Sequence, residues 1–314
     1  MPVARYGVLV AVGSGDTYSV SLVDNTGKVV ASATPSSPAP VTCGGSAGAV
    51  LPQPVSTSNT RVYFLDQSGN VNFLSPNGVT GVSTHVPTGA SIRSMFTVSP
   101  DDQRIAVVES TYSASGATTV LYAEDLNGGN NHVKLFTQTG AYSLWPIGWH
   151  GTNNLVVAKV PTCTQGGGPG CCGPQELHVV DPATAVRRFT IGSSTCVPVG
   201  AATPAGALCE TSSFTQVRVL SWTGAVVQTY PIQGPTPAYL SPDGNRVALV
   251  VDNATTFAGA KQTLDMLACG WIDDTHVLAG GDAQLQPRIG DVATGNIVPV
   301  SAQGVCGGSI PGGL

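Results

Sequence analysis

SPDDQRIAVV at Ser99–Val108 and SPDGNRVALV at Ser241–Val250 share one pattern, a polar turn followed by an apolar, β-branched run. Pro and Asp preset the first positions of a tight turn, and Gly or Asn accepts a positive φ. The apolar run does not alternate with polar residues, which predicts a strand buried on both faces. Looser copies of this first turn type begin at Ser58, Gly151, Thr203 and Asp273.

A second turn type alternates with the first along the chain. Its copies are Asp24–Gly27, Ser75–Gly78, Asp125–Gly128, Asp181–Thr184, Ser221–Gly224 and Asp291–Gly295. Alternating strands flank these turns, which are therefore hairpin signals. Two hairpins in alternation make a four-stranded unit, and such a unit repeating every ~40–50 residues is typical of a propeller blade. The sequence predicts an all-β fold, a single β-propeller domain over residues 1–314.

The two ends of the chain complete one blade in this interpretation. The strand Tyr6–Val12 stands where the second strand of a blade belongs, and Val305–Ile310 resembles a spare first strand. Joining them gives a seventh blade and removes two exposed sheet edges. The sequence CGGS occurs at both Cys43–Ser46 and Cys306–Ser309. We therefore expect each copy to begin an innermost strand, in adjacent blades.

The sixth blade is irregular. Between Asp252 and Met266 the sequence contains no turn of the second type, so we expect this blade to be one strand short. The predicted count is seven blades, with six as the alternative if the irregular blade merges with its neighbour.

The repeat resembles that of TolB-type (PD40-like) bacterial propellers. The resemblance lies in Ser99–Val108 followed by Leu121–Gly129, and in the blade that contains Ser241–Gly244. Two further stretches, Gly148–Gly151 and Gly270–Leu278, resemble a variant common in actinobacterial surface propellers. The resemblance covers most of the chain and implies the fold. Members of the family include periplasmic scaffolds, sensor domains and the propeller halves of prolyl-oligopeptidase-type peptidases, but this chain has no Gly-x-Ser-x-Gly nucleophile elbow.

Composition excludes several partners. Only 10% of the residues are charged, the net charge is −5, and the only adjacent basic pair is Arg187-Arg188. Nucleic acids and anionic membranes are bound by clustered Lys and Arg, so we expect neither as a partner. No apolar stretch approaches the ~18 residues of a membrane span, so we expect no membrane insertion of this chain.

Eight cysteines in a chain rich in Gly, Ser and Thr indicate an oxidising compartment, with reduced buried cysteines as the alternative. We therefore expect an extracellular or cell-envelope protein. Met1-Pro2-Val3 leads directly into a strand with no signal peptide, so we expect the chain to derive from a longer precursor or a membrane-anchored parent.

Three disulfide arrangements are geometrically plausible. Cys196 and Cys209 fall on neighbouring antiparallel strands of one blade. A bridge from Cys163 to Cys171 or Cys172 would close a Gly-rich loop and limit its entropy. The remaining candidates, Cys43, Cys269 and Cys306, are expected at the mouth of the central channel, where a bridge would staple the ring. A zinc site built from these three thiolates is the alternative, but no Cys-x-x-Cys spacing supports it.

The sequence predicts no metal site and no cofactor. The five histidines, His85, His132, His150, His178 and His276, fall in five different blades and share no motif. Acidic turns such as Asp24–Gly27 lack the remaining ligands of a calcium loop, so turn chemistry explains them.

A candidate binding face follows from loop length. Two loops between second and third strands are expected to be long, Pro161–Pro174 and Asp252–Gln262, and they flank the fifth blade. Functional loops on rigid scaffolds tend to be such insertions. Aromatic residues that could line a pocket on this face are Tyr142, Trp145, Tyr239 and Phe257. The alternative is that Trp145 and Tyr239 pack between blades.

These observations favour a non-catalytic binding scaffold that recognises a protein, peptide or glycan on its loop-rich face. One rival is a propeller hydrolase or lyase with its site at the channel mouth. Histidines within ~6 Å of one another or of a carboxylate would favour that rival. A second rival is the extracellular sensor domain of a membrane-anchored parent.

Overall fold

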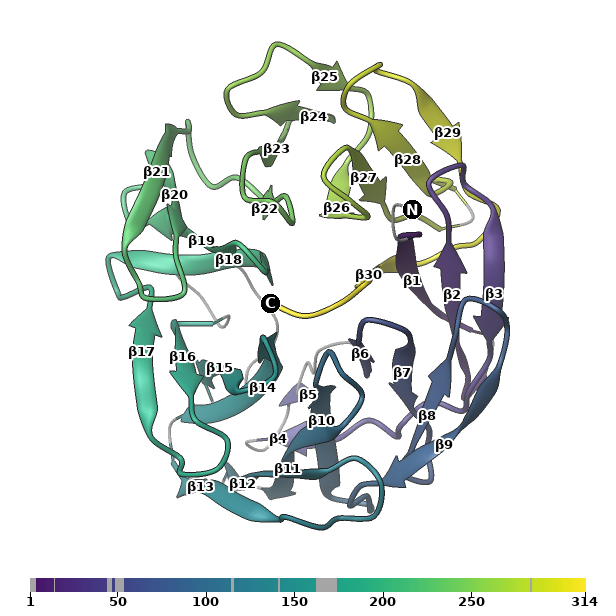
Figure 1. The fold of residues 1–314 in the computed structure, drawn as a ribbon, viewed down its shortest axis with the longest axis vertical. Coiled ribbons are helices and arrows are strands. Elements are labelled where there is room, and N and C mark those ends of the chain that lie inside the picture. The colour runs from purple at the N-terminus through teal and green to yellow at the C-terminus, as the bar shows by residue number, and fades with distance from the viewer. Residues whose placement is uncertain are drawn as a thin grey trace.

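The computed structural model describes residues 4–13, 15–43, 47–48, 54–113, 116–140, 142–161, 174–282 and 284–314. Seven four-stranded antiparallel sheets surround a central channel, and every regular element in the described residues is a strand (Figure 1). The fold is therefore a seven-bladed β-propeller, as the alternating turns predicted, and the six-bladed alternative is wrong.

Blades are numbered here along the chain, and strands run from the channel outwards. Blade 1 consists of β30 (Val305–Ile310), β1 (Tyr6–Val12), β2 (Tyr18–Val23) and β3 (Val29–Ala33). Blade 2 consists of β6 (Val55–Thr57), β7 (Val62–Leu65), β8 (Asn70–Leu74) and β9 (Thr80–His85). Blade 3 consists of β10 (Ile92–Val98), β11 (Arg104–Ser113), β12 (Gly116–Asp125) and β13 (Val133–Thr139). Blade 4 consists of β14 (Tyr142–His150), β15 (Asn154–Pro161), β16 (Glu176–Val180) and β17 (Arg187–Ile191).

The remaining blades follow the same order. Blade 5 consists of β18 (Cys196–Thr203), β19 (Gly206–Thr211), β20 (Gln216–Leu220) and β21 (Val226–Pro231). Blade 6 consists of β22 (Ala238–Leu240), β23 (Val247–Val251), β24 (Ala254–Phe257) and β25 (Thr263–Leu264). Blade 7 consists of β26 (Ala268–Trp271), β27 (His276–Ala279), β28 (Arg288–Asp291) and β29 (Ile297–Pro299).

Blade 1 closes the ring with strands from both ends of the chain, as predicted. In the antiparallel register of β30 and β1, Tyr6 is opposite Ile310 and Val10 is opposite Val305. In Figure 1 the yellow β30 lies beside the purple β1, and the chain then continues into the centre of the ring.

Two expectations about individual strands are wrong. Blade 6 is not one strand short, because a two-residue turn at Asp252-Asn253 leads into β24, and β25 follows with only two residues. The segment Asp252–Gln262 is therefore not one long loop, because it contains the strand β24. Cys43 does not begin an innermost strand either, since it ends β4 (Thr42–Cys43), which pairs only with β5 (Ala47–Gly48) in a hairpin between blades 1 and 2.

The core of the protein lies between the blades. Seven hydrophobic clusters of described residues occupy the seven junctions between neighbouring blades, one cluster per junction. The second strands supply fully buried runs such as Ile105–Val108 and Leu155–Ala158. Apolar side chains on both faces of these strands are removed from water, which explains why the sequence runs do not alternate.

Tryptophans at the ends of inner strands tie successive blades together. The indole N–H of Trp149, in β14, donates to the carbonyl of Thr97 in β10 at 3.3 Å. The indole N–H of Trp271, in β26, donates to the carbonyl of Tyr239 in β22 at 2.9 Å. Each bond fixes one inner strand against the preceding one, so the channel wall is a rigid frame for the sites described below.

Candidate functional site

The central channel encloses a cavity of about 670 Å³ that is lined by the inner strands of all seven blades. The segment after β30 crosses it. The backbone N–H of Gly312 donates to the carbonyl of Ser58 in blade 2 at 2.7 Å, and the N–H of Leu314 donates to the carbonyl of Trp149 in blade 4 at 2.8 Å. His150 Nδ1 lies 2.8 Å from the Leu314 carbonyl. Because these partners lie at turns of the first type, this segment crosses the channel on the face formed by those turns.

A second cavity, of about 700 Å³, lies beside the channel at the inner strand of blade 5. The residues that line both cavities are Ile147, Ala201, Ala202, Tyr239 and Leu314. The two spaces therefore adjoin across β18, and we call the second one the β18 cavity.

The β18 cavity exists because β18 departs from its partner strand. Val199 is opposite Leu208 and Thr203 is opposite Gly206, so residues 200–202 bulge opposite Ala207 alone. Gly200 has a φ of 64°, and a Cβ at this position would lie 2.1 Å from the carbonyl oxygen of Ala238. Only glycine fits this turn of the backbone against β22. Such bulges are over-represented next to functional sites.

Glu210 is the only charged residue that lines the β18 cavity in the described part of the chain. It lies in β19 opposite Val197, and only 1% of its surface is exposed. Its Oε1 accepts the backbone N–H of Thr236 at 2.9 Å, in the segment that leads from blade 5 to blade 6. Burial raises the pKa of this carboxyl, and the hydrogen bond from Thr236 offsets only part of that effect.

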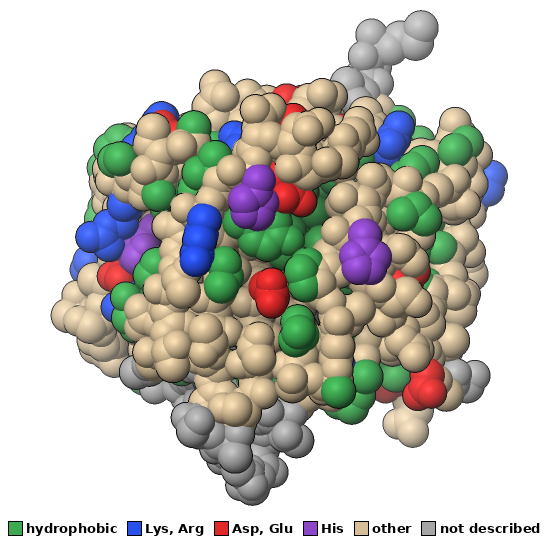
Figure 2. All heavy atoms as spheres, turned by 90° about the horizontal axis from the view of Figure 1, so that it is seen from below, with side chains coloured by type: hydrophobic (Ala, Val, Ile, Leu, Met, Phe, Trp, Pro, Cys, Tyr) green, Lys and Arg blue, Asp and Glu red, His purple; other side chains and the backbone are tan. Residues whose placement is uncertain are grey.

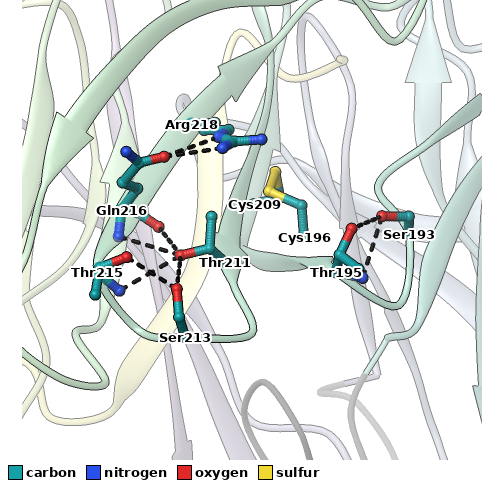
Figure 3. The surroundings of a disulfide bond; sticks show 9 residues. All are labelled: Ser193, Thr195, Cys196, Cys209, Thr211, Ser213, Thr215, Gln216 and Arg218. Carbon is teal, nitrogen blue, oxygen red and sulfur yellow. Dashed lines mark hydrogen bonds between the residues drawn. A yellow bond between two sulfur atoms is a disulfide. The ribbon is translucent and has the colours of Figure 1, made fainter.

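A disulfide holds the strand beside the bulge. Cys196 in β18 and Cys209 in β19 are bonded, with Cα atoms 5.2 Å apart (Figure 3). Both cysteines belong to the hydrophobic cluster between blades 4 and 5. Figure 3 shows a network of hydroxyl groups around Thr211 next to the bridge, where Thr211 Oγ1 accepts the backbone N–H of Gln216 at 3.2 Å. Glu210, directly after Cys209, is therefore carried on a covalently anchored strand.

A second disulfide joins Cys269 in β26 to Cys306 in β30, with Cα atoms 5.7 Å apart. It links blade 7 to blade 1 at the channel wall, where the sequence predicted a staple from among Cys43, Cys269 and Cys306. Because Cys306 is bonded to Cys269, it is not available to Cys43. Cys163, Cys171 and Cys172 lie outside the described residues.

Of the four aromatic residues proposed from sequence, one lines the two cavities described above. Tyr239 lines both cavities. Phe257 is 2% exposed and packs edge-on against Trp271, with ring centroids 5.7 Å apart. Trp145 packs against the clusters on both sides of blade 4. Tyr142 contacts Phe136, with centroids 6.1 Å apart, and the Lys159 ammonium lies 5.0 Å from its ring centroid.

Three histidines satisfy the distance condition that would favour an enzyme. The pairs are His132 with Glu124 at 2.7 Å, His178 with Glu176 at 2.9 Å, and His276 with Asp273 at 2.9 Å. They lie in blades 3, 4 and 7 and line neither cavity. Each is therefore a separate local contact, and the three do not converge into one acid–base site. The expectation that the five histidines fall in five different blades is wrong, since His150 in β14 and His178 in β16 both belong to blade 4.

Charged side chains are otherwise sparse. On the side of the molecule shown in Figure 2, cations and anions are scattered among uncharged surface rather than gathered into a patch. Within the described ranges, no three His, Cys, Asp or Glu side chains are grouped to hold a metal ion. The same ranges contain no helix long and apolar enough to cross a membrane.

Comparison with known proteins supports the fold alone. No family model matches the chain, and no curated protein matches it. A functionally unknown protein from Desulfotomaculum acetoxidans DSM 771 is similar in structure, with a TM-score of 0.55, 9% identity, and coverage of 96% of this chain and 98% of that one. A chain of the mitotic checkpoint complex is similar with a TM-score of 0.51 and 14% identity over 83% of this chain and 77% of that one.

A protein assigned as TolB from Agrobacterium tumefaciens is also among the similar structures. Its TM-score is 0.44 at 14% identity, over 82% of this chain and 83% of that one. This likeness is too weak to carry an argument, so membership of the TolB-type family stays a prediction.

Sequence reasoning missed Glu210. A signal was present, because ALCET at Ala207–Thr211 places an acidic residue in a second strand that should be buried on both faces. A lone acid in such a strand needs a partner or a function.

Proposed function

We propose that the protein is a non-catalytic, extracellular or cell-envelope binding scaffold that recognises a protein, peptide or glycan on one face of the ring. The observation that supports this most is the unequal distribution of connections on that face. In every blade the connection from the second to the third strand and the connection to the next blade emerge on the same side, because neighbouring strands are antiparallel.

On that face the connections differ in size from blade to blade. The β4–β5 hairpin lies between β3 and β6, and its β4 lies close to β11. β11 and β12 have ten residues each and form an extended hairpin. By contrast, blades 5 and 6 turn within Ser212–Thr215 and Asp252-Asn253. A rigid ring with insertions on one side is the arrangement in which loops carry recognition.

The two disulfides support an oxidising location for this scaffold. Structural disulfides form and persist in secreted and periplasmic proteins and are rare in the cytosol. Protein binding is also consistent with the likeness to a chain of the mitotic checkpoint complex, although at 14% identity that likeness extends to the fold only.

The test is a binding screen against glycan and peptide arrays, with matched surface variants. We expect saturable binding that Thr111→Arg/Thr118→Arg weakens at least tenfold, since these exposed residues face each other across the β11–β12 hairpin. Val79→Arg, exposed in the turn between β8 and β9 on the opposite face, should leave binding unchanged. Equal effects of both variants would argue against this face, and turnover of ester, glycoside or peptide substrates would favour the hydrolase alternative.

A further inference from the structure

We propose that the β18 cavity binds a small apolar molecule that carries a protonated amine, with the ammonium group paired to Glu210. This inference goes beyond surface recognition by the loops, because it assigns a ligand class to a space inside the ring.

The size and lining of the cavity suit a small apolar molecule. Its volume of about 700 Å³ lies within the ~300–1,000 Å³ typical of ligand pockets. The walls are aliphatic side chains and proline rings, including Leu177, Pro198, Val199, Leu208 and Pro237. Such walls favour burial of an apolar ligand body but offer almost no hydrogen bonds to a polar one.

The charge of Glu210 is not explained by structure alone. Its one hydrogen bond within the described residues, from the N–H of Thr236, would be made equally well by the amide oxygen of a glutamine. A carboxylate can accept several hydrogen bonds, and no cation in the described residues pairs with this one. A buried, unpaired carboxylate is destabilising, so a bound ammonium group would supply the missing counter-charge.

Tyr239 adds a second feature that suits a cation. Its ring contributes to the wall between the β18 cavity and the channel. The face of an aromatic ring attracts ammonium groups. The two cavities adjoin at this residue, so the Tyr239 side chain is available to a ligand in the β18 cavity.

The channel differs from the β18 cavity in charge, because its described lining contains Arg5 and Arg93 and no Asp or Glu side chain. Arg93 lines the channel but is only 3% exposed, and its Nη1 donates to the carbonyls of Gly89 and Ile92 at 3.0 and 2.6 Å. Its Nε and Nη2 are fully enclosed and have no hydrogen-bond partner among the described residues. A ligand in the channel therefore cannot reach these nitrogens of Arg93 without displacing its neighbours. The preference for a cation applies to the β18 cavity, where Glu210 is the charged residue of the described lining.

Calorimetric titration with three matched probes tests the proposal: 2-phenylethylamine, 2-phenylethanol and 3-phenylpropionate. We expect the amine to bind at least tenfold more tightly than the alcohol, and the carboxylate to bind most weakly. Glu210→Gln should reduce amine affinity at least tenfold while leaving alcohol affinity unchanged. Glu109→Gln is the matched control, because Glu109 lies on β11, the second strand of blade 3.

Equal affinity for amine and alcohol would overturn the proposal, as would an amine affinity that survives Glu210→Gln, or no binding of any probe at millimolar concentration. A measurement on the unaltered protein covers the case in which the variant does not fold. In carbon-detected NMR titrations of the glutamate carboxyls, the amine should lower the pKa of Glu210 and the alcohol should not. An amine that leaves this pKa unchanged would also overturn the proposal.

Discussion

The innermost strands β30 and β18 both contain a disulfide-bonded cysteine, but they differ in how closely they pack against neighbouring strands. β30 is pressed against its neighbours, since a Cβ on Gly307 would lie 2.8 Å from a methyl of Val10 and 3.3 Å from one of Val55. β18 instead bulges away from β19 at residues 200–202 and leaves a cavity. The Cys269–Cys306 bridge crosses between blades, whereas the Cys196–Cys209 bridge stays within one.

This difference separates ring closure from the formation of a binding space. β30 and β26 belong to different sheets, so the bridge between them adds a connection that sheet hydrogen bonds do not provide. β18 and β19 are already hydrogen-bonded, so their bridge anchors a strand whose ladder is interrupted by the bulge. The bulged strand β18 lies beside the buried carboxyl of Glu210.

The largest effect is expected from Gly304→Ala, directly before the closely packed strand β30. Gly304 has a φ of 129°, and a Cβ there would lie 2.5 Å from the backbone of Val10. Backbone strain and overpacking together should lower the free energy of unfolding by about 5 kcal/mol. Urea unfolding measures the change.

Gly89→Ala is the control for this substitution. A methyl group at Gly89 would make ordinary contacts with Ile92 at 3.6 Å, so its cost should stay within about 0.5 kcal/mol. If Gly304→Ala were as mild as Gly89→Ala, close packing of β30 would not be what closes the ring.

Removal of the disulfides should have the next largest effects, and it should distinguish the two strands. The loop closed by Cys269 and Cys306 has a sequence separation of 37, and that closed by Cys196 and Cys209 a separation of 13. Loop entropy predicts a loss of about 4 kcal/mol for Cys269→Ala/Cys306→Ala and about 3 kcal/mol for Cys196→Ala/Cys209→Ala.

The pattern of amide exchange should differ more clearly than these energies. Without the Cys269–Cys306 bridge, the amides of β30 and β1 should exchange faster than those of other strands. The pairing of β30 with β1 then closes the ring without a covalent link. Without the bridge inside blade 5, faster exchange should be confined to β18 and β19. Uniform acceleration in both variants would contradict the assignment of separate roles.

Turn chemistry made the blade count and ring closure predictable from sequence. The Ser-Pro-Asp turns reappear in the structure with Ser99 and Ser241 fully buried, and each hydroxyl accepts the backbone N–H five residues later, at 2.9 and 3.0 Å. Local bonds of this kind leave a local sequence signal. Blade 6 was misjudged because β25 has two residues and no hairpin turn of the second type precedes it.

The cavity could not be predicted in the same way. Its shape depends on a bulge in β18 and on the approach of β22 to Gly200, and neither contact is local in sequence. The aromatic residues were assigned to a binding face because of their position near loops, but Phe257 packs in the hydrophobic cluster between blades 6 and 7. Residue type alone does not distinguish an aromatic ring that lines a cavity from one that packs between sheets.

The smallest predicted effect is an increase in stability, and it comes from Glu210→Gln beside the β18 bulge. Because burial raises the pKa of Glu210, the folded state binds its proton more tightly than the unfolded state. The stabilising contribution of the protonated carboxyl is complete below the unfolded pKa and is lost as pH rises through the folded pKa. Glutamine cannot ionise and keeps an acceptor for the N–H of Thr236, so the variant should be more stable by about 1 kcal/mol at pH 7.5 and equal to the original protein near pH 4.

Urea unfolding of both proteins at the two pH values measures this difference, and the other titrating groups cancel between them. A gain in stability together with a loss of amine binding is the expected signature of a charge retained for a ligand rather than for the fold. If Glu210→Gln were instead less stable at pH 7.5, the carboxylate would be a structural partner of Thr236. The buried charge of Glu210 would then serve the fold rather than a ligand.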